Sequence, residues 1–291
     1  PEHPWRHPHV LAHRGACGYR PEHTLAGYEL AARLCADFLT VDLVSTGDGV
    51  LVARHEPEIS RSTDVADHPE FAPRRTTRRI AGHPVHGWFV DDFTIEELKT
   101  LRARERLPLL RPENTAFDDR FEIPTLDEVV DLREQLSATL GWEIGLYVEV
   151  RCPGYHAGLG LTPGPALLAT LDRAGLNHRQ APVFVAARSP AALRELSGQG
   201  LGAPAVHLLT GSGGHGPGRV GTVGGRPRLP SPADLELVAE YAQGIAPDRD
   251  QVVIPATDGR PRRPTSLVRD AHDAGLLVHP RTFRAERAYL P

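Results

Sequence analysis

Histidines and arginines stand at the ends of several short apolar runs of this sequence. His13 and Arg14 end the first run, His55 follows the third, Arg151 follows the fourth and His279 ends the last. Two histidines on opposite sides of a phosphorus atom can serve as general base and general acid, because both titrate near neutral pH. Arginine matches phosphate oxygens with paired hydrogen bonds, so Arg14 and Arg151 are candidates for holding the anion. The set predicts cleavage of a phosphodiester.

Two carboxylates accompany these residues. Asp42 lies in the second apolar run and Glu149 lies near the end of the fourth. Carboxylates from different strands can hold a hard divalent cation through oxygen, and such a cation neutralises charge on phosphoryl oxygens. The same residues also fit a purely structural interpretation, in which carboxylates pair with arginines and histidines are hydrogen-bonded in the core. Residue types alone leave both interpretations open.

The apolar runs alternate with longer helical patterns, which is typical of βα units on a parallel sheet. We expect eight strands, at residues 10–13, 38–44, 50–54, 144–150, 182–186, 205–209, 244–246 and 276–279. We expect helices at residues 24–35, 94–104, 125–137, 164–174, 190–197, 232–243 and 265–274. Eight strands favour an α/β fold of the (β/α)8 TIM-barrel type over a doubly wound sheet. In such a barrel, side chains at the carboxyl ends of the strands meet at one mouth.

The composition is that of a folded protein with a large core. The chain has 291 residues, a formal net charge of −4, and is 40% hydrophobic and 24% charged. This length fits a single barrel domain over residues 1–291, with residues 59–124 as an insertion after the third strand. The near-neutral charge argues against nucleic acid as a partner, and no apolar run is long enough to span a membrane. Three cysteines are too few for a disulfide framework.

Other segments carry weaker predictions. The glycine-rich stretch at residues 210–230 predicts a surface loop, and His3 and His7 with the prolines beside them predict an extended arm. The chain contains no Met, so we expect that its start has been removed. The compartment therefore stays open between a secreted or cell-envelope location and the cytoplasm, and so does the oligomeric state.

Several motifs of this chain resemble the glycerophosphodiester phosphodiesterase family. The most specific are AHRGA at 12–16, PEHT at 21–24, VDLV at 41–44 and DGVLVARHEP at 48–57. Further matches lie at residues 36–38, 87–89, 104–108, 122–125, 147–149, 244–247 and 275–280. The resemblance covers most of the chain and implies a (β/α)8 barrel, in agreement with the strand count.

The resemblance also implies a mechanism. His13 and His55 match the acid and base of the family, and Arg14 matches its phosphate-binding arginine. Asp42 and Glu149 match two of the three carboxylates that hold Ca²⁺ or Mg²⁺. In the family, a glycerol hydroxyl attacks phosphorus and expels the alcohol, and water then opens the cyclic phosphate to give glycerol 3-phosphate.

Four departures from the family pattern cluster where substrate and metal are expected. Thr40 stands where the family has a metal-ligating glutamate, and Arg151 stands in place of a lysine. Arg188 and Arg281 replace residues of other types after later strands. In one interpretation the remaining ligands hold the cation more weakly, and water, Glu22 or Glu56 completes its coordination.

In the other interpretation, the arginines take over anion binding without a metal. We expect Arg151, Arg188 and Arg281, together with Arg14, Glu22 and His279, to contact the substrate. The leading hypothesis is hydrolysis of a small-molecule glycerophosphodiester. The alternatives are a different, possibly biosynthetic reaction on a phosphorylated or diphosphorylated substrate, and a non-catalytic protein that binds an anion or a phospholipid headgroup.

Overall fold

The computed structural model describes residues 8–211, 219–220, 222–223, 226–227, 229–254, 262–286 and 288. His3, His7 and most of the glycine-rich stretch lie outside the described residues. The chain divides into two compact units, Pro1–Leu176 with Glu286–Pro291, and Asn177–Ala285. Each unit is described by itself. The prediction of a single domain stays a prediction.

Parallel strands form the centre of the first unit. The strands β1 (Leu11–Ala12), β2 (Phe38–Ser45) and β6 (Gly145–Val150) pair in the order β1–β2–β6. Seven of the eight residues of β2 are buried, which is typical of a strand covered on both faces. Asp42 is therefore a charged residue within an apolar strand, and it lies opposite Glu149 of β6.

The third predicted strand departs from the expected pattern. The strand β3 (Leu51–Ala53) pairs antiparallel with β2, so it is the return of a hairpin and not a parallel barrel strand. Residues 46–50 alone connect the two strands, whereas a parallel crossover needs about a dozen residues or more. Gly49 takes a left-handed φ of 85° in this connection and lets the chain reverse.

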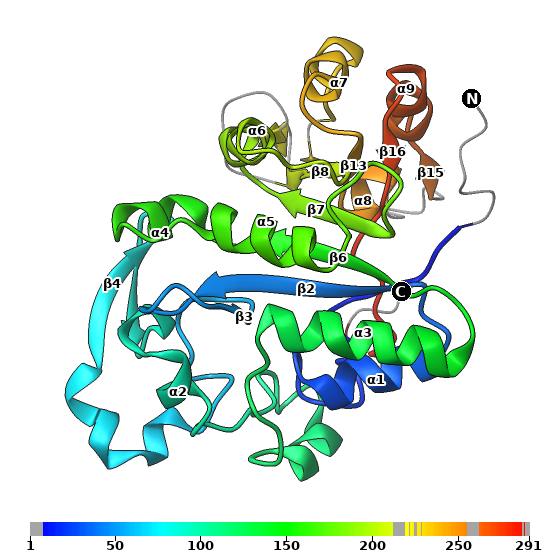
Figure 1. Ribbon diagram of the computed structural model, residues 1–291. Coiled ribbons are helices and arrows are strands. Elements are labelled where there is room, and N and C mark those ends of the chain that lie inside the picture. Colours follow the sequence, from blue (N-terminus) through cyan, green and yellow to red (C-terminus); the bar gives the residue numbers. More distant parts are fainter. Residues whose placement is uncertain are drawn as a thin grey trace. The chain divides into compact units, whose positions relative to one another are not determined.

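Two helices of the first unit begin at the predicted capping boxes, and one at residues 153–158 was not predicted. The helices of this unit are α1 (Leu25–Arg33), α2 (Ile95–Leu98), α3 (Leu126–Leu140), α4 (Pro153–Gly158) and α5 (Pro163–Arg173). Thr94 and Thr125 each form a capping box with the glutamate three residues later. The helix α2 is shorter than predicted, because the N–H of Arg102 bonds to Asp64 and that of Arg104 bonds to Ser62. The helices α1 and α3 pack side by side (Figure 1).

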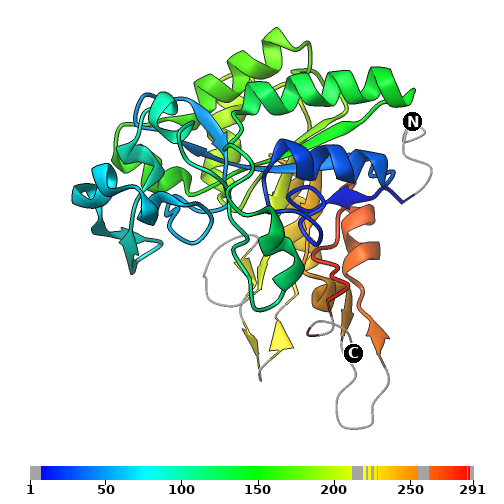
Figure 2. The ribbon, with the colours of Figure 1, turned by 90° about the horizontal axis from the view of Figure 1, so that it is seen from below.

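The predicted insertion forms a substructure with its own core. It holds the short 3-10 helices Val65–Asp67, Pro69–Arg74, Val90–Asp92 and Pro112–Phe117, and the hairpin of β4 (Thr76–Ile80) and β5 (His83–Gly87). Its buried side chains pack on Val44 of β2 and Val52 of β3. In Figures 1 and 2 the part drawn in cyan lies at the carboxyl end of β2. The insertion thus stands where the barrel prediction puts the functional side chains.

The second unit repeats the alternation of strands and helices. Its parallel strands pair in the order β7 (Val183–Ala187), β8 (Ala205–Leu208), β13 (Gly244–Ala246) and β16 (Leu277–Val278). Its helices are α6 (Pro190–Gly198), α7 (Pro232–Ala239), α8 (Arg249–Val252) and α9 (Leu267–Asp273). Short strand pairs join β9 (Thr210–Gly211) to β10 (Arg219–Val220), β11 (Thr222–Val223) to β12 (Arg226–Pro227), and β14 (Val253–Ile254) to β15 (Arg263–Pro264).

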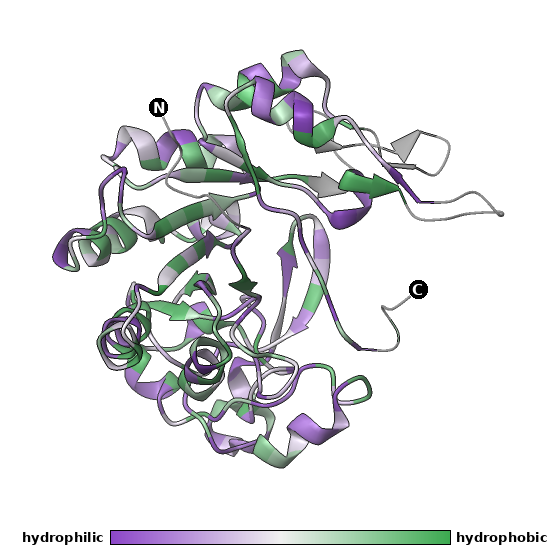
Figure 3. Cartoon of the chain, turned by 90° about the vertical axis from the view of Figure 1, so that its right-hand side faces the viewer, coloured by the Kyte–Doolittle hydropathy of each residue, from purple (hydrophilic) through white to green (hydrophobic). Residues whose placement is uncertain are grey.

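Hydropathy follows this architecture. In Figure 3 the parallel strands at the centre are mainly green, whereas the helices carry both colours, as expected for helices with one apolar side. Leu193, Leu235, Val238 and Ile245 lie in the buried cluster of the second unit. Over the part of the chain that the structure describes, no helix has the length and apolar character needed to cross a bilayer. Cys17 and Cys35 form no disulfide.

Candidate active site

Arg14 is the centre of a buried cluster in the first unit. It follows β1 in a left-handed conformation, with a φ of 59°. Its Nη1 donates to Glu22 Oε2 at 2.8 Å, its Nε lies 3.1 Å from Asp42 Oδ2, and its backbone N–H donates to Thr40 Oγ1 at 2.7 Å. Two carboxylates therefore hold the guanidinium, and Thr40 holds the backbone of the same residue.

The turn after Arg14 depends on a glycine. Gly15 has a φ of 79°, and a Cβ at this position would lie 2.9 Å from the backbone carbonyl carbon of Gly27 in α1. The backbone N–H of Ala16 also donates to the carbonyl oxygen of Gly27 at 2.9 Å. Close contact between this turn and α1 thus places Arg14 next to the residues that precede the helix.

Glu22 is a buried carboxylate between two arginines. Besides Arg14, it accepts a hydrogen bond from Arg106 Nε at 2.9 Å. Burial by itself raises the pKa of Glu22, but the charges of Arg14, His23 and Arg106 outweigh it, so the pKa lies well below the ordinary value. Sequence reasoning missed Arg106, although the matching stretch at 104–108 was a signal that the insertion contributes to the site.

Asp42 belongs to a second chain of buried polar groups. His23 Nε2 lies 3.1 Å from Asp42 Oδ2, and His23 Nδ1 lies 2.7 Å from the hydroxyl of Tyr28. Burial raises the pKa of Asp42, but the hydrogen bond from His23 and the charges of His23 and Arg14 hold it well below the ordinary range. Burial also lowers the pKa of His23, although Asp42 opposes this. With a proton on Nε2, His23 donates to Asp42, and when the ring is neutral its Nδ1 accepts from the hydroxyl of Tyr28.

His55 follows β3 and lies among charged groups of the same site. Its side chain is 17% exposed, and its Nδ1 lies 3.3 Å from Glu56 Oε1. Burial lowers the pKa of His55, the hydrogen bond with Glu56 raises it, and the charges of Arg14 and Arg151 lower it, with a net decrease. A histidine with a lowered pKa is neutral at pH 7 and can accept a proton.

Glu149 and Arg151 complete the group at the end of β6. Arg151 forms an ion pair with Glu149, and its Nε donates to the carbonyl oxygen of His55 at 2.8 Å. Burial lowers the pKa of Arg151, but Glu149 and Asp42 raise it, and the net shift is upward. The end of β6 is thereby joined to the segment that follows β3.

The remaining predicted residues are placed by their elements. His13 is half-buried and directly follows β1, next to Arg14. In the second unit, His279 follows β16, and its ring lies edge-to-face against Phe184 with centroids 4.8 Å apart. Arg281 Nη2 donates to the carbonyl oxygen of Leu209 at 3.3 Å. Arg188 is exposed between β7 and α6 in that unit. The predicted roles of these residues stay predictions.

The described residues do not fit a divalent cation. No three His, Cys, Asp or Glu side chains among them are grouped so as to hold a metal. Asp42 and Glu149, the predicted ligands, are each paired with an arginine. Thr40, the third predicted position, offers a hydroxyl that already accepts the N–H of Arg14. Asp42 Oδ2 and the hydroxyl of Thr40 are therefore already engaged by donors of the chain, and the charge of Glu149 is paired with Arg151.

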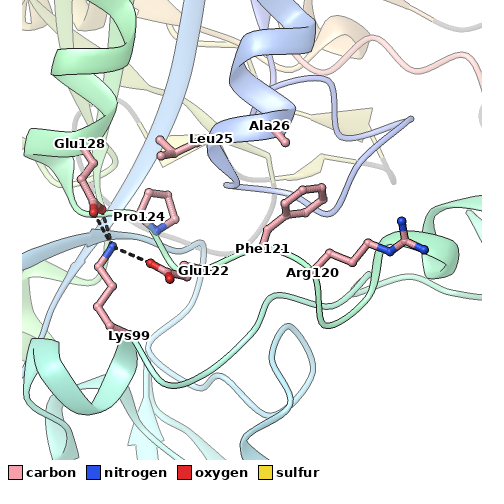
Figure 4. A pocket seen from close by; sticks show the side chains of 8 residues that line it. All are labelled: Leu25, Ala26, Lys99, Arg120, Phe121, Glu122, Pro124 and Glu128. Atoms are coloured by element: carbon pink, nitrogen blue, oxygen red, sulfur yellow. Dashed lines mark hydrogen bonds and ion pairs between the residues drawn. The ribbon is translucent and has the colours of Figure 1, made fainter.

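A separate hollow lies elsewhere in the first unit. Its volume is about 230 Å³, and Figure 4 shows that Lys99 points toward Glu128 and Glu122 along its wall. It is lined by Leu25, Ala26, Lys99, Arg120, Phe121, Glu122, Pro124 and Glu128. None of these is a predicted site residue. The ammonium of Lys99 bonds to Glu128 Oε1 at 2.7 Å, so the charge of Lys99 is already paired.

Comparisons with known proteins agree with the motifs. Residues 13–160 match the glycerophosphoryl diester phosphodiesterase family. A glycerophosphodiester phosphodiesterase of Arabidopsis thaliana is 31% identical over 301 residues, which cover 97% of this chain and 76% of the relative. The match includes the segments that carry Arg14, Asp42 and His55.

Solved structures extend the likeness to the fold. A glycerophosphoryl diester phosphodiesterase from Silicibacter pomeroyi has a TM-score of 0.66 at 23% identity, over 95% of this chain and 84% of its own. A phosphodiesterase of Oleispira antarctica, solved with the product sn-glycerol-3-phosphate, has a TM-score of 0.64 at 20% identity, over 96% and 85%. At these identities the likeness concerns the fold alone. It confirms the predicted α/β fold of the TIM-barrel type.

Proposed function

This chain belongs to the glycerophosphoryl diester phosphodiesterase family, and from that premise we propose that it hydrolyses a glycerophosphodiester to glycerol 3-phosphate and an alcohol. The observation that carries the proposal is the cluster in which Arg14, Arg151 and His55 come together at the ends of neighbouring strands. The bound product of the Oleispira antarctica phosphodiesterase supports the choice of substrate class.

Two histidines supply the proton transfers of the proposed reaction. One neutral histidine of the pair His13 and His55 takes the proton of a glycerol hydroxyl as that oxygen attacks phosphorus. The other, protonated, gives its proton to the departing alkoxide, and a cyclic phosphodiester remains. Water then attacks the cyclic phosphodiester with the two roles exchanged, and glycerol 3-phosphate is released with both histidines restored.

Arginines bind and orient the phosphodiester. Arg14 uses Nε and Nη1 on two carboxylates, and a guanidinium has five N–H donors, so it can add a phosphoryl oxygen while both ion pairs persist. Arg151 is held between Glu149 and the backbone of His55. From this position the guanidinium of Arg151 binds the phosphoryl group next to His55 and stabilises the charge that develops on the phosphoryl oxygens.

In this proposal Glu22 positions an arginine and does not contact the substrate. From its motif, Glu22 is expected to contact the substrate, but its two oxygens accept hydrogen bonds from Arg14 and Arg106. We therefore assign it the role of positioning Arg14. Although the family is known for using a divalent cation, the donor set described above does not fit one, and no step of this mechanism passes through a metal.

The experiment is release of glycerol 3-phosphate from a panel of glycerophosphodiesters, measured with wild-type protein and with His13→Ala and His55→Ala. We expect release by the wild type and a loss of at least about 100-fold in kcat for each variant, as for removal of a general acid or base. His83→Ala, at an exposed position of β5, is the matched control and keeps full activity. Wild-type protein that is folded and releases no product from any substrate refutes the proposal.

A further inference from the structure

Every carboxylate of the site has a cationic or hydrogen-bond-donating partner within the chain. Asp42 Oδ2 is contacted by Arg14 and by His23, both at 3.1 Å. Glu22 accepts hydrogen bonds from Arg14 and Arg106 on separate oxygens, with donor–acceptor distances of 2.8 and 2.9 Å. Ca²⁺ takes six to eight oxygen ligands and draws its affinity from carboxylate charge. Here that charge is already neutralised by the protein.

The count of charges leads to the same conclusion. Three buried or half-buried carboxylates, Glu22, Asp42 and Glu149, are paired with three guanidinium groups, those of Arg14, Arg106 and Arg151. The fourth carboxylate of the site, Glu56, is exposed and contacts His55. A divalent cation would add two positive charges beside carboxylates whose charge is already balanced, and the neighbouring guanidinium groups would repel it.

Thr40 places a neutral hydroxyl at a position where a further carboxylate could have acted. It lies two residues before Asp42 on β2, so both side chains are on the same face of the strand. Its hydroxyl accepts the N–H of Arg14 at 2.7 Å. A neutral hydroxyl in this position orients Arg14 and adds no negative charge that would favour a metal.

We propose that the active site of this chain functions without a divalent cation, and that Arg14 and Arg151 neutralise the phosphoryl charge in its place. This inference rests on the proposed function, because it concerns how the same site stabilises the charge of its substrate. The guanidinium groups are permanently charged and already oriented by Glu22, Asp42 and Glu149. They therefore provide positive charge before the substrate binds.

Calorimetric titration of the purified chain with Ca²⁺ and with Mg²⁺ tests the inference independently of turnover. We expect no binding heat at millimolar cation and no change in melting temperature between cation and excess chelator. Saturable binding of either cation at one site, abolished in Asp42→Asn, overturns the inference whether or not the protein is active. Absence of binding supports it even if no substrate is turned over, in which case the proposed function alone fails.

Two variants at position 40 sharpen the test. Thr40→Glu adds the missing charge on the face of Asp42, and we expect it to gain Ca²⁺ binding and a cation-dependent rise in melting temperature. Thr40→Gln has the same size without the charge and should gain neither. If both variants and the wild type fail to bind, the arginine pairs alone exclude the cation, and the inference stands.

Activity gives the second readout. We expect kcat/KM of the wild type to be unchanged by excess chelator, because the charges that stabilise the phosphoryl group belong to the chain. Activity that disappears with chelator and returns with added Ca²⁺ or Mg²⁺ contradicts the inference and leaves the proposed function intact.

Discussion

Arg14 connects more parts of the site than any other residue described above. Its side chain reaches Glu22 and Asp42, and its backbone reaches Thr40. We predict that Arg14→Lys lowers kcat/KM by about 100-fold, because an ammonium cannot replace the fork and a hydrogen bond to a charged group contributes roughly 1.5–3 kcal/mol. Steady-state kinetics with a glycerophosphodiester measures this.

A matched substitution separates charge from geometry. Arg33→Lys changes an exposed arginine of α1 that pairs with Glu29. It should leave kcat/KM unaltered, since exposed pairs contribute little. Equal effects of the two substitutions would show that Arg14 has no special place in the reaction.

Glu56 tunes the protonation of His55. The hydrogen bond from His55 to Glu56 raises the pKa of His55 against the lowering by burial and by the two arginines. Glu56→Gln removes that contribution, so the pKa of His55 should fall further below 6.5, and the neutral base should persist to lower pH. The acid limb of the kcat/KM profile should move to lower pH in parallel with the titration of the His55 ring in NMR spectra. A limb that moves to higher pH is incompatible with this assignment.

The insertion contributes to the site through Arg106. This residue lies in the segment between α2 and α3 and binds Glu22, which lies between β1 and α1. We predict that Arg106→Gln lowers the free energy of unfolding by roughly 1–3 kcal/mol, because one of the two partners of a buried carboxylate is lost. Urea denaturation measures the change, and Arg61→Gln, at an exposed position of the same insertion, is the control.

The pH dependence of that difference follows from Glu22. Because the pKa of Glu22 is lowered in the folded state, the stability from its ion pairs is complete above the ordinary pKa of 4.5. It is lost as the pH falls below that value toward the folded-state pKa. The difference between Arg106→Gln and the wild type should therefore shrink below pH 4.5. A difference that grows in acid would place the effect of Arg106 elsewhere.

Most elements could be predicted from the sequence, because their signals are local. The capping boxes at Thr94 and Thr125 and the apolar run of β2 depend on neighbouring residues alone. The direction of β3 was predicted wrongly, since a short apolar run is the same in parallel and antiparallel pairing. The short connection at residues 46–50 was the signal that could have decided it.

Site residues also differ in how far they could be predicted from the sequence. The motifs lead directly to Arg14, Asp42, His55, Glu149 and Arg151, and the structure brings these five together. The pairing of Glu22 with Arg106 and the pairing of Asp42 with His23 each join two different motifs of the sequence. Residue types do not specify such contacts, because any arginine of the insertion could have met that carboxylate.

At the scale of the whole molecule, the site described here is built by the first unit. Its strands, its insertion and α1 supply the arginines, the carboxylates and His55. The second unit carries His279, Arg188 and Arg281, whose expected contact with substrate stays a prediction. Arg14, Arg151 and His55, on which the proposed function rests, all belong to the first unit.

One measurement tests the central claim most directly. A glycerophosphodiester is incubated with the purified chain in excess chelator, and its phosphorus species are followed by ³¹P NMR. The account predicts conversion to glycerol 3-phosphate that is lost in His55→Ala and kept in His83→Ala. An unchanged substrate signal in the presence of folded wild-type protein, with and without added Ca²⁺ or Mg²⁺, would contradict the claim that this site cleaves glycerophosphodiesters.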